Sequence, residues 1–401
     1  MSNLPISNME QFKKQIDNPK QVISDNTNQN VVKVRKNLII AYQSDQGGCG
    51  NIRTGIPMSY INSAFGRGGR LNISLTTFFI FQPEVLVNVR SIWFQRMMDP
   101  KQLERVSEYK RIQEQFKFKM IYDLDDNIYG HNELQGGNKQ DGVPSYNFGS
   151  EKIDDIIKST SIKIMNLMDT VCTSTDYLGN ILKNNGVTVP IKTVYNTIPL
   201  FFYGNKKKEP IKEKITKPRI IYTGSPTHYH NGKELLGDWE NNWLEYITKS
   251  VIDNKIDFIC MGGCPFFFEN IKGRSNFKII EWHPFYNYHL PLLDFKADFS
   301  IGPLVINQFN RAKSDIKAIE SYASGSLFIG TIFNDKTPSP YDNCFLKLYN
   351  DCSVKDIQTI IEEYSYPEKY NDVMNKQYQY LLNEGRYTES PKFINNLLSI
   401  I

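Results

Sequence analysis

Short apolar runs alternate with helical patterns along most of the chain. In the first half, the runs at 38–42 and 119–124 read as strands, and helical spacing extends from 99 to about 116. Asp99 is a suitable N-cap residue, and Pro100 suits the first helical position. Apolar strands separated by amphipathic helices indicate parallel sheets that are covered by helices on both faces.

The same alternation starts again in the second half. Strands are expected at 219–222, 257–261 and 297–301, and a helix from about 314 to 323 stops before Gly325. Two such arrays in one chain predict an α/β protein of two Rossmann-like domains. In this class, ligands bind at the carboxyl ends of the strands, here in a cleft between the domains.

The pattern also suggests where the domains begin and end. Residues 1–36 are polar and show no sustained apolar period, so they read as an N-terminal extension. We expect one Rossmann-like domain at 37–198 and a second at 199–375. The helical residues 376–401 are expected to pack back across both domains.

The composition fits a globular protein. The chain has 401 residues, of which 40% are hydrophobic and 22% charged, enough for two domains of ordinary size. No apolar run reaches about eighteen residues, and the first ten residues lack the basic and apolar regions of a signal peptide. We therefore expect no transmembrane segment and no secretion, and a cytoplasmic location.

The cysteines do not predict a metal or disulfide framework. Six cysteines are few for a disulfide scaffold of this length, so free thiols are expected. Cys260 and Cys264 are spaced like half of a zinc site, but no second pair accompanies them. No metal site is predicted from the cysteines.

The positive charge gathers in two stretches. Lys and Arg exceed Asp and Glu by only 47 to 43, yet residues 51–98 hold five arginines against one glutamate. Residues 205–219 hold six lysines and one arginine against two glutamates. Such stretches suit an anionic partner, although an unoccupied basic linker explains the second equally well.

A glycine-rich turn follows the first expected strand. Residues 47–50 read Gly-Gly-Cys-Gly, which lets the backbone approach a ligand and presents amide groups at a helix start. Gly48 and Gly50 are therefore candidate ligand-binding residues, with a simple tight turn as the alternative. The turn is not Gly-x-Gly-x-x-Gly and no Walker lysine follows, which disfavours a nicotinamide dehydrogenase or a P-loop ATPase.

Three acidic residues stand at the end of the strand at 119–124. Asp123, Asp125 and Asp126 lie within four residues, and such groups repel one another unless a cation or a polar substrate offsets them. Asp125 and Asp126, with His131 in the polar loop that follows, are the candidate catalytic residues. A metal-binding Asp-x-Asp and a strand-end cap are the alternatives.

The most informative constellation lies between 310 and 320. Arg311, Lys313 and Ser314 come at the start of an expected helix, where free amide groups add to their charge, a combination that suits a diphosphate. Glu320 follows seven residues after Lys313 and could accept hydrogen bonds from ribose hydroxyls. The alternative is a charged surface helix.

A second turn of a size that fits a phosphate follows the strand at 219–222. It holds Ser225 and His228, which we assign to the same donor ligand. The alternative for His228 is an ordinary loop histidine.

Taken together, these motifs resemble the GT-B glycosyltransferases, in particular the retaining group that uses nucleotide sugars. The resemblance covers about 37–401. The pattern Lys313-Ser314-x-x-Lys317-x-x-Glu320 is similar to the donor signature, with Glu320 at the second acid of the Glu-x7-Glu motif and Ala312 where the first would stand. It implies two Rossmann-like domains, an interdomain cleft and a C-terminal helix that crosses back.

The same resemblance implies a chemistry. The donor would be a uridine diphosphate sugar, used as a co-substrate, with no tightly bound cofactor. Lys313, Arg311 and backbone amides near Ser225 would stabilise the departing diphosphate in place of a metal.

Three motifs of the first half resemble a narrower group. The segments 46–53, 93–96 and 122–126 look like glycosyltransferases carried by large tailed phages, some of which add glucose or arabinose to 5-hydroxymethylcytosine in DNA. The resemblance implies a double-stranded DNA acceptor, a base flipped out of the duplex and, for a phage protein, the host cytoplasm. The residues expected to contact DNA phosphates are Arg53, Arg67, Arg70 and Arg96.

Two other functions fit the same residues. One is a cytosolic glycosyltransferase that builds a surface polysaccharide or a glycolipid, and such enzymes often dock on membranes through basic amphipathic helices. The other is a catalytically silent protein that binds nucleic acid or sugar on a borrowed fold. Hydrolysis of the donor would exclude the second.

Overall fold

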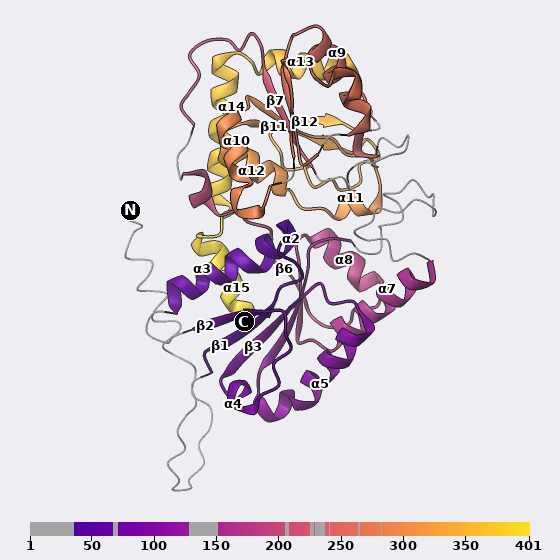
Figure 1. The fold of residues 1–401 in the computed structure, drawn as a ribbon, viewed down its shortest axis with the longest axis vertical. Helices are drawn as coiled ribbons and strands as arrows, with labels where there is room; N and C mark the ends of the chain where they lie inside the picture. Colours follow the sequence, from indigo (N-terminus) through magenta and orange to yellow (C-terminus); the bar gives the residue numbers. More distant parts are fainter. Residues whose placement is uncertain are drawn as a thin grey trace.

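A computed structural model describes most of the chain from residue 36 onward. The described residues are 36–66, 71–127, 151–204, 208–224, 228, 237–239, 241–263, 265–281 and 283–401, with only the backbone at 151–154. They form two α/β domains that lie one above the other (Figure 1), each built around a six-stranded sheet.

The first sheet consists of parallel strands in the order β2-β1-β3-β4-β5-β6. They are β1 (Leu38–Tyr42), β2 (Asn72–Thr76), β3 (Val89–Gln95), β4 (Lys119–Leu124), β5 (Thr170–Thr173) and β6 (Ile191–Thr193). The helices around them are α2 (Gly48–Gly50), the π-helical η1 (Asn51–Gly55), α3 (Ile56–Phe65), α4 (Pro83–Leu86), α5 (Pro100–Phe116), α7 (Glu151–Asn166) and α8 (Asp176–Asn184). The strand order reverses between β1 and β3, and such a reversal opens a ligand crevice at the carboxyl ends of the strands.

The second sheet is also parallel, in the order β12-β11-β10-β7-β8-β9. Its strands are β7 (Arg219–Thr223), β8 (Asp257–Met261), β9 (Phe277–Ile280), β10 (Phe299–Gly302), β11 (Leu327–Ile332) and β12 (Leu346–Tyr349). Its α-helices are α9 (Trp243–Ile252), α10 (His289–Phe295), α11 (Gln308–Ala312), α12 (Ile316–Ser324), α13 (Val354–Glu363) and α14 (Pro367–Asn383), with α15 (Pro391–Ile400) following. Here the order reverses between β7 and β10, which places a second switch point there.

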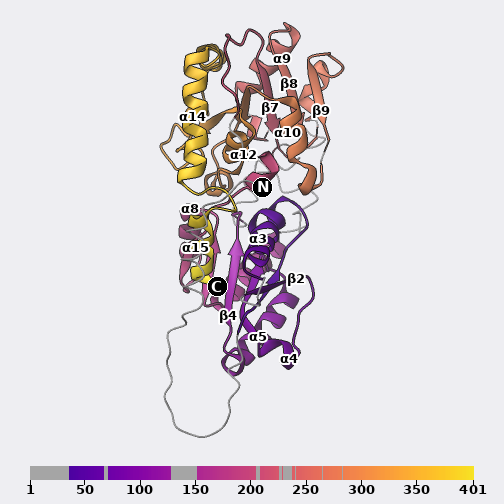
Figure 2. The ribbon, with the colours of Figure 1, turned by 90° about the vertical axis from the view of Figure 1, so that its left-hand side faces the viewer.

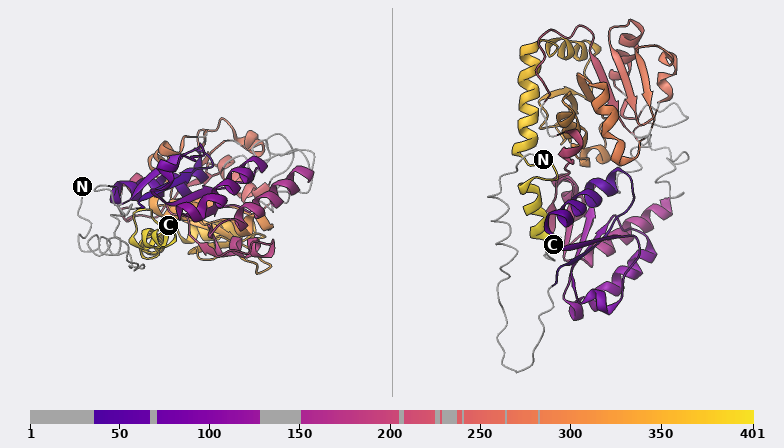
Figure 3. Two further views of the ribbon diagram at one scale, coloured as in Figure 1. Left: turned by 90° about the horizontal axis from the view of Figure 1, so that it is seen from below. Right: turned by 60° about the vertical axis from the view of Figure 1, so that its left-hand side comes forward.

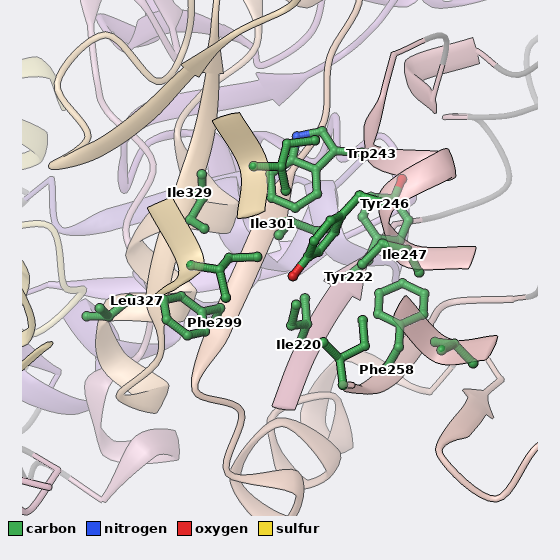
Figure 4. Close-up of a cluster of buried hydrophobic side chains, with 14 of the residues drawn as sticks. Ile220, Tyr222, Trp243, Tyr246, Ile247, Phe258, Phe299, Ile301, Leu327 and Ile329 are labelled. Carbon is green, nitrogen blue, oxygen red and sulfur yellow. The ribbon is translucent and has the colours of Figure 1, made fainter. Parts of the chain in front are cut away.

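Alternate residues of each strand face opposite layers of the core, as a pleated strand requires. In β7, Ile220 and Tyr222 belong to the apolar cluster on the α9 and α13 side, whereas Ile221 belongs to the cluster on the α10 and α12 side. Figure 4 shows Tyr222 beside Trp243 and Phe258 in the first of these clusters. Both faces of the sheet are therefore buried, as the unbroken apolar runs predicted.

Local capping explains where α5 begins. The Asp99 side chain accepts from the Lys101 amide at 2.7 Å, and the Gln102 side chain accepts from the Asp99 amide at 2.9 Å. This capping box, with Pro100 at the first helical position, satisfies amide groups that would otherwise lack partners. The predicted start of this helix is confirmed.

The C-terminal helices connect the two domains. Figure 2 shows α14 along the second domain and α15 along the first, on the same side of the molecule, and Figure 3 shows the same crossing from another direction. Phe393, Leu397 and Ile400 of α15 pack into the core of the first domain against Ile39 and Trp93. The prediction of two Rossmann-like domains with a C-terminal helix that crosses back is confirmed.

One predicted helix starts later than expected. The sequence predicted a single helix from about residue 314, but the chain forms α11, then an extended Lys313, then α12 from Ile316. Asn307, whose side chain accepts from the Asn310 amide at 2.7 Å, starts α11 about two turns earlier than the predicted helix. Lys313 therefore lies in the connection between two helices rather than in the first turn of one.

Among the described residues, no helix has both the length and the apolar character needed to cross a membrane.

Candidate functional site at the domain junction

The loops that follow the switch-point strands meet where the domains touch. Across this junction, Asn127 donates to the Gln308 carbonyl at 3.2 Å, and Thr175 donates to the Ala312 carbonyl at 3.1 Å. Figure 1 shows α8 and α11 side by side at this place. The acidic motif of the first domain and the cationic segment of the second are thus brought to one region.

A buried cluster of charged side chains lies at the switch point of the second domain. Asp238 is 1% exposed, and its carboxylate lies 2.6 Å from His228 Nδ1 and 3.6 Å from Lys313 Nζ. Asn310 donates to the other carboxylate oxygen at 2.6 Å. Because an isolated buried carboxylate would be costly, these partners are what hold Asp238 ionised.

The pKa values in this cluster favour a neutral imidazole beside a charged carboxylate. Burial, together with the ammonium groups of Lys313 and Lys317, lowers the pKa of His228 to about 3, although Asp238 acts against this shift. His228 Nδ1 lies 2.6 Å from the Asp238 carboxylate and 3.1 Å from Lys313 Nζ, and the shorter contact with an acceptor places the ring proton on Nδ1, which leaves Nε2 as an acceptor. That nitrogen can accept a hydrogen bond from a ligand hydroxyl.

Lys317 carries an ammonium group without a hydrogen-bond partner among the described residues. Its Nζ is buried and stands 4.9 Å from the centre of the Tyr222 ring. Burial, and then the charge of Lys313, lower the pKa of Lys317 to about 7. A buried, unpartnered cation in the first turn of a nine-residue helix is suited to an anionic ligand.

Glu320 lies one helical turn beyond Lys317 on the same face of α12. Burial raises the pKa of Glu320 to about 8, although the ammonium group of Lys317 acts against this shift. A carboxyl group held in this position can exchange hydrogen bonds with the hydroxyls of a ligand.

The pKa of Lys317 leads to a prediction about proton uptake. Near pH 7 and above, Lys317 loses its proton in the free protein, whereas a bound diphosphate requires the ammonium form. When uridine diphosphate binds near pH 8, the wild-type protein should therefore take up as much as about one proton more than Lys317→Met does. The affinity of the wild-type protein for uridine diphosphate should fall by at most about tenfold per pH unit above 7. Calorimetry in buffers of different ionisation enthalpy measures this difference, and equal uptake by the two proteins would contradict the assignment.

In the first domain, Arg96 holds the acidic pair together. Its Nη2 lies 2.6 Å from a carboxylate oxygen of Asp125 and 2.6 Å from one of Asp126. Burial alone would raise the pKa of Asp125, but Arg96 and a hydrogen bond from Cys49 outweigh it and lower the pKa. Burial, followed by the charge of Asp125, raises the pKa of Asp126, whose side chain is 25% exposed. Asp126 is thus the more accessible and more easily protonated of the two.

These acids also form the candidate metal group of the described residues. Ligand atoms of Cys49, Asp125 and Asp126 lie within 4.8 Å of one another. The guanidinium of Arg96 already contacts both carboxylates, so their charge is balanced by a side chain. Arg96 thus supplies at these two acids the positive charge that a cation would otherwise supply.

Two arginines expected to contact DNA are instead buried. Arg53 forms a bidentate ion pair with Asp123, and the side chains of the two residues are 2% and 0% exposed. Arg96 is 8% exposed and paired as described above. The interpretation of Arg53 and Arg96 as a DNA-contacting surface is corrected, because neither guanidinium is accessible to a polyanion.

Other predicted ligand residues have local partners. The Gly50 amide donates to the Asp45 carboxylate at 3.2 Å, and a Cβ at this glycine would lie 1.8 Å from the Asp45 carbonyl oxygen. Gly50 therefore serves close packing rather than binding, which corrects its assignment, whereas Gly48 is exposed. Arg311 pairs with Asp335 at 2.8 Å, and Ser314 accepts a hydrogen bond from Asn196 at 2.7 Å.

Four predicted site residues lie outside the described part of the chain. They are Arg67, Arg70, His131 and Ser225.

Asp238 was not predicted from the sequence, and Asn310 and Lys317 were noted only as members of the 310–320 constellation, without a role. Asp238 lies in a stretch that reads as the beginning of a helix, and no local pattern marks it as buried. Its role follows only from the fold, which brings the 237–239 segment against α11.

Comparisons with known proteins identify the architecture. No protein-family model and no curated protein sequence matches this chain. Among solved structures, HepE (Alr3699) from Anabaena, in complexes with UDP and glucose and with UDP-glucose, is 9% identical with a TM-score of 0.54, over 91% of this chain and 100% of its own. The chain has the GT-B fold.

A second solved structure gives a lower score. The α,α-trehalose 6-phosphate synthase from Burkholderia multivorans matches with a TM-score of 0.49 and 7% identity, over 91% of this chain and 98% of its own. In the GT-B fold of this chain, both switch points lie at the domain junction, and the buried cations belong to the second of them.

Proposed function

We propose that this protein is a glycosyltransferase that moves a sugar from a uridine diphosphate sugar to a hydroxyl acceptor. The observation that carries the proposal is the buried cluster of Lys313, Lys317 and His228 with Asp238, at the switch point of the second domain and one turn from Glu320. The GT-B likeness to HepE, which is described in complex with UDP and UDP-glucose, agrees with it.

The donor diphosphate is assigned to Lys317, Lys313 and the amide groups at the start of α12. Lys317 has no hydrogen-bond partner among the described residues, and Lys313 Nζ lies 3.6 Å from the Asp238 carboxylate and 3.1 Å from His228 Nδ1. When the bond from the sugar to the diphosphate breaks, negative charge develops on the phosphate oxygens, and fixed cations stabilise that charge without reorganising. Glu320 is assigned to the ribose hydroxyls and His228 Nε2 to a hydroxyl of the donor.

On the acceptor side, Asp126 is assigned to orient the attacking hydroxyl. It is the more exposed acid of the pair held by Arg96. We infer a retaining transfer, in which the departing diphosphate accepts the proton of the acceptor hydroxyl. Arg96 lowers the pKa of Asp125, which makes that carboxylate a weak proton acceptor and supports this inference.

Asp126→Asn provides a test of this assignment. The amide keeps the shape of the side chain but weakens its bond to a hydroxyl, so kcat/KM for the acceptor should fall by about ten- to a hundredfold. KM for the donor should change less than kcat/KM for the acceptor, since Asp126 acts on Lys313 only through its charge. A loss confined to donor KM would contradict the acceptor role.

The acceptor itself is proposed as the hydroxymethyl group of 5-hydroxymethylcytosine in duplex DNA, and the transferred sugar as glucose or arabinose. The support is the resemblance of the segments 46–53, 93–96 and 122–126 to phage enzymes. The burial of Arg53 and Arg96 removes part of the charge argument for DNA. The synthesis of a surface polysaccharide or glycolipid is the alternative.

A release assay separates these possibilities. Uridine diphosphate release is measured with a panel of uridine diphosphate sugars in the presence of hydroxymethylated duplex DNA, unmodified DNA or buffer. Release that requires the hydroxymethyl group supports the DNA acceptor. Slow release that is independent of DNA supports the donor assignment and contradicts the DNA acceptor. The absence of release with every donor would contradict the proposal that the protein is a glycosyltransferase.

Removal of divalent metals provides a further prediction. Since Lys313, Lys317 and the α12 amides supply the positive charge at the diphosphate, a chelator should leave the rate of transfer within about twofold of its value without chelator. The assay compares initial rates with and without the chelator, and with magnesium added back. A rate that collapses in chelator and recovers with magnesium would contradict a donor site built from lysines.

A further inference from the structure

Helix α11 and the residues that connect it to α12 are held on their first-domain side by hydrogen bonds from three separate segments. Gln308, Ala312 and Ser314 accept hydrogen bonds from Asn127, Thr175 and Asn196, respectively, at 3.2, 3.1 and 2.7 Å. This connection carries Lys313. The position of the proposed diphosphate ligand therefore depends on contacts outside its own sheet.

The Asn196 contact continues into the core of the first domain. While its amide donates to Ser314, the Asn196 side-chain oxygen accepts from Arg53 Nη1 at 3.0 Å. Arg53 in turn pairs with Asp123 at the end of β4. A continuous buried chain of hydrogen bonds thus runs from the acidic motif to the connection between α11 and α12.

Arg386 fastens the same connection from the chain segment that crosses between α14 and α15. Its Nη1 donates to Asp315 Oδ2 at 2.9 Å and its Nη2 pairs with Oδ1, while its Nε donates to the Asn196 carbonyl at 3.1 Å. Arg386 is 6% exposed. A bidentate pair of this kind fixes direction as well as distance.

The Asp315 side chain pairs with Arg386 in place of the usual N-cap hydrogen bond to a helix amide. Asp315 is the N-cap residue of α12, yet its side chain caps no amide of the helix. Its carbonyl oxygen accepts from the Ala318 and Ile319 amides at 2.9 and 3.1 Å, while its carboxylate is turned to Arg386 instead. The start of α12 is thus held by a residue that lies 71 positions along the chain.

We infer that Arg386 is a positioning residue for the donor site. By holding Asp315 and the Asn196 carbonyl at once, it fixes the start of α12 relative to the segment at Asn196, and so fixes the positions of Lys313 and Lys317. Arg386 touches neither the proposed diphosphate nor the sugar, and it acts through Asp315. This role rests on the proposed function, because it requires that the Lys313 and Lys317 site binds the donor.

The test compares Arg386→Ala with a matched loss of another arginine–aspartate pair in the same domain. Arg219 pairs with Asp298 at 3.0 Å, where β7 and β10 begin, at the opposite ends of these strands from the donor loops. Arg386→Ala should lower kcat/KM for the donor by about a hundredfold, since small misplacements of binding groups cost this much. Arg219→Ala should leave kcat/KM within about threefold.

Two further variants distinguish positioning from general destabilisation. Arg386→Lys keeps the charge but not the bidentate contact with Asp315, so it should recover stability while recovering only a small part of the lost kcat/KM. Asp315→Ala should reproduce the loss, and the double variant should be no worse than either single variant, because both remove one interaction. An equal loss in Arg219→Ala, or additive losses in the double variant, would overturn the inference.

A measurement without substrate makes the result independent of the proposed function. Hydrogen exchange of the Ala318 and Ile319 amides in the ligand-free protein should speed up by about tenfold or more in Arg386→Ala and remain unchanged in Arg219→Ala. Unchanged exchange in Arg386→Ala overturns the positioning role even if the protein is an enzyme. Faster exchange in a protein that does not bind uridine diphosphate would instead reject the donor assignment.

Discussion

Replacing Lys313 with alanine is expected to lower the rate of sugar transfer by about a hundredfold or more, the loss that follows when a fixed charge-stabilising group is removed. Lys313 lies 3.6 Å from the buried Asp238 carboxylate, so its ammonium is directed into the cluster rather than into solvent. Its removal has a second effect, because Asp238 then loses a positive neighbour. Initial rates at saturating donor and acceptor measure the loss.

Two variants sharpen this prediction. Lys313→Arg keeps the charge and should retain more activity than Lys313→Ala. Arg311→Ala tests the other cation expected at the diphosphate, and because Arg311 pairs with Asp335 at 2.8 Å, this variant should lose less activity than Lys313→Ala. Turnover near the wild-type rate in Lys313→Ala would contradict the donor-site assignment.

The largest effect on stability is expected at Asp123. It is 0% exposed and forms a bidentate pair with Arg53, so Asp123→Ala leaves a buried guanidinium without its charge partner. Removing one member of a buried pair costs about 3–5 kcal/mol in the free energy of unfolding. Denaturant unfolding monitored by circular dichroism measures this difference.

A double replacement tests whether Arg53 and Asp123 stabilise the fold through their ion pair. Arg53→Leu combined with Asp123→Leu removes both charges, and the unfolding free energy should recover much of what Asp123→Ala loses, since no uncompensated charge remains. A full-size loss in the double variant would show that the two side chains stabilise the fold by packing rather than by pairing. Asp123 is therefore expected to be structural, although it stands in the same motif as Asp125 and Asp126.

The sequence predicted the architecture because both sheets are parallel and buried on both faces. Their strands then appear as unbroken apolar runs, such as that at Leu38–Tyr42, and the helices between them have clear caps, such as Asp99. The start of α12 was misplaced because Asn307 caps an additional short helix. A pattern of hydrophobic residues does not show which of two polar residues will act as a cap.

The candidate site was predicted only in part. Lys313 and Glu320 stand in one short segment, so their spacing indicated a shared site. The prediction that Arg53 and Arg96 form a phosphate-binding surface was wrong for a physical reason. A count of charges along the chain cannot show that Asp123 and Asp125, distant in sequence, neutralise them in the folded protein.

Asp238 was not predicted because its charge, too, is balanced by residues that are distant in the sequence. A buried carboxylate can be recognised only with its partners, and these come from α11 and from His228. The prediction that Gly50 binds a ligand was also wrong, because the Gly50 amide donates its hydrogen bond to the Asp45 side chain instead.

The most direct test of the central claim is a calorimetric titration of the wild-type protein and of the double variant Lys313→Ala, Lys317→Ala with uridine diphosphate and with uridine. The account predicts that the wild-type protein binds uridine diphosphate with a dissociation constant below about 1 mM, the upper end of the range in which enzymes hold their substrates. It predicts much weaker binding of uridine, and loss of the preference for the diphosphate in the double variant. Equal binding of uridine and uridine diphosphate, or an unchanged preference in the double variant, would contradict it.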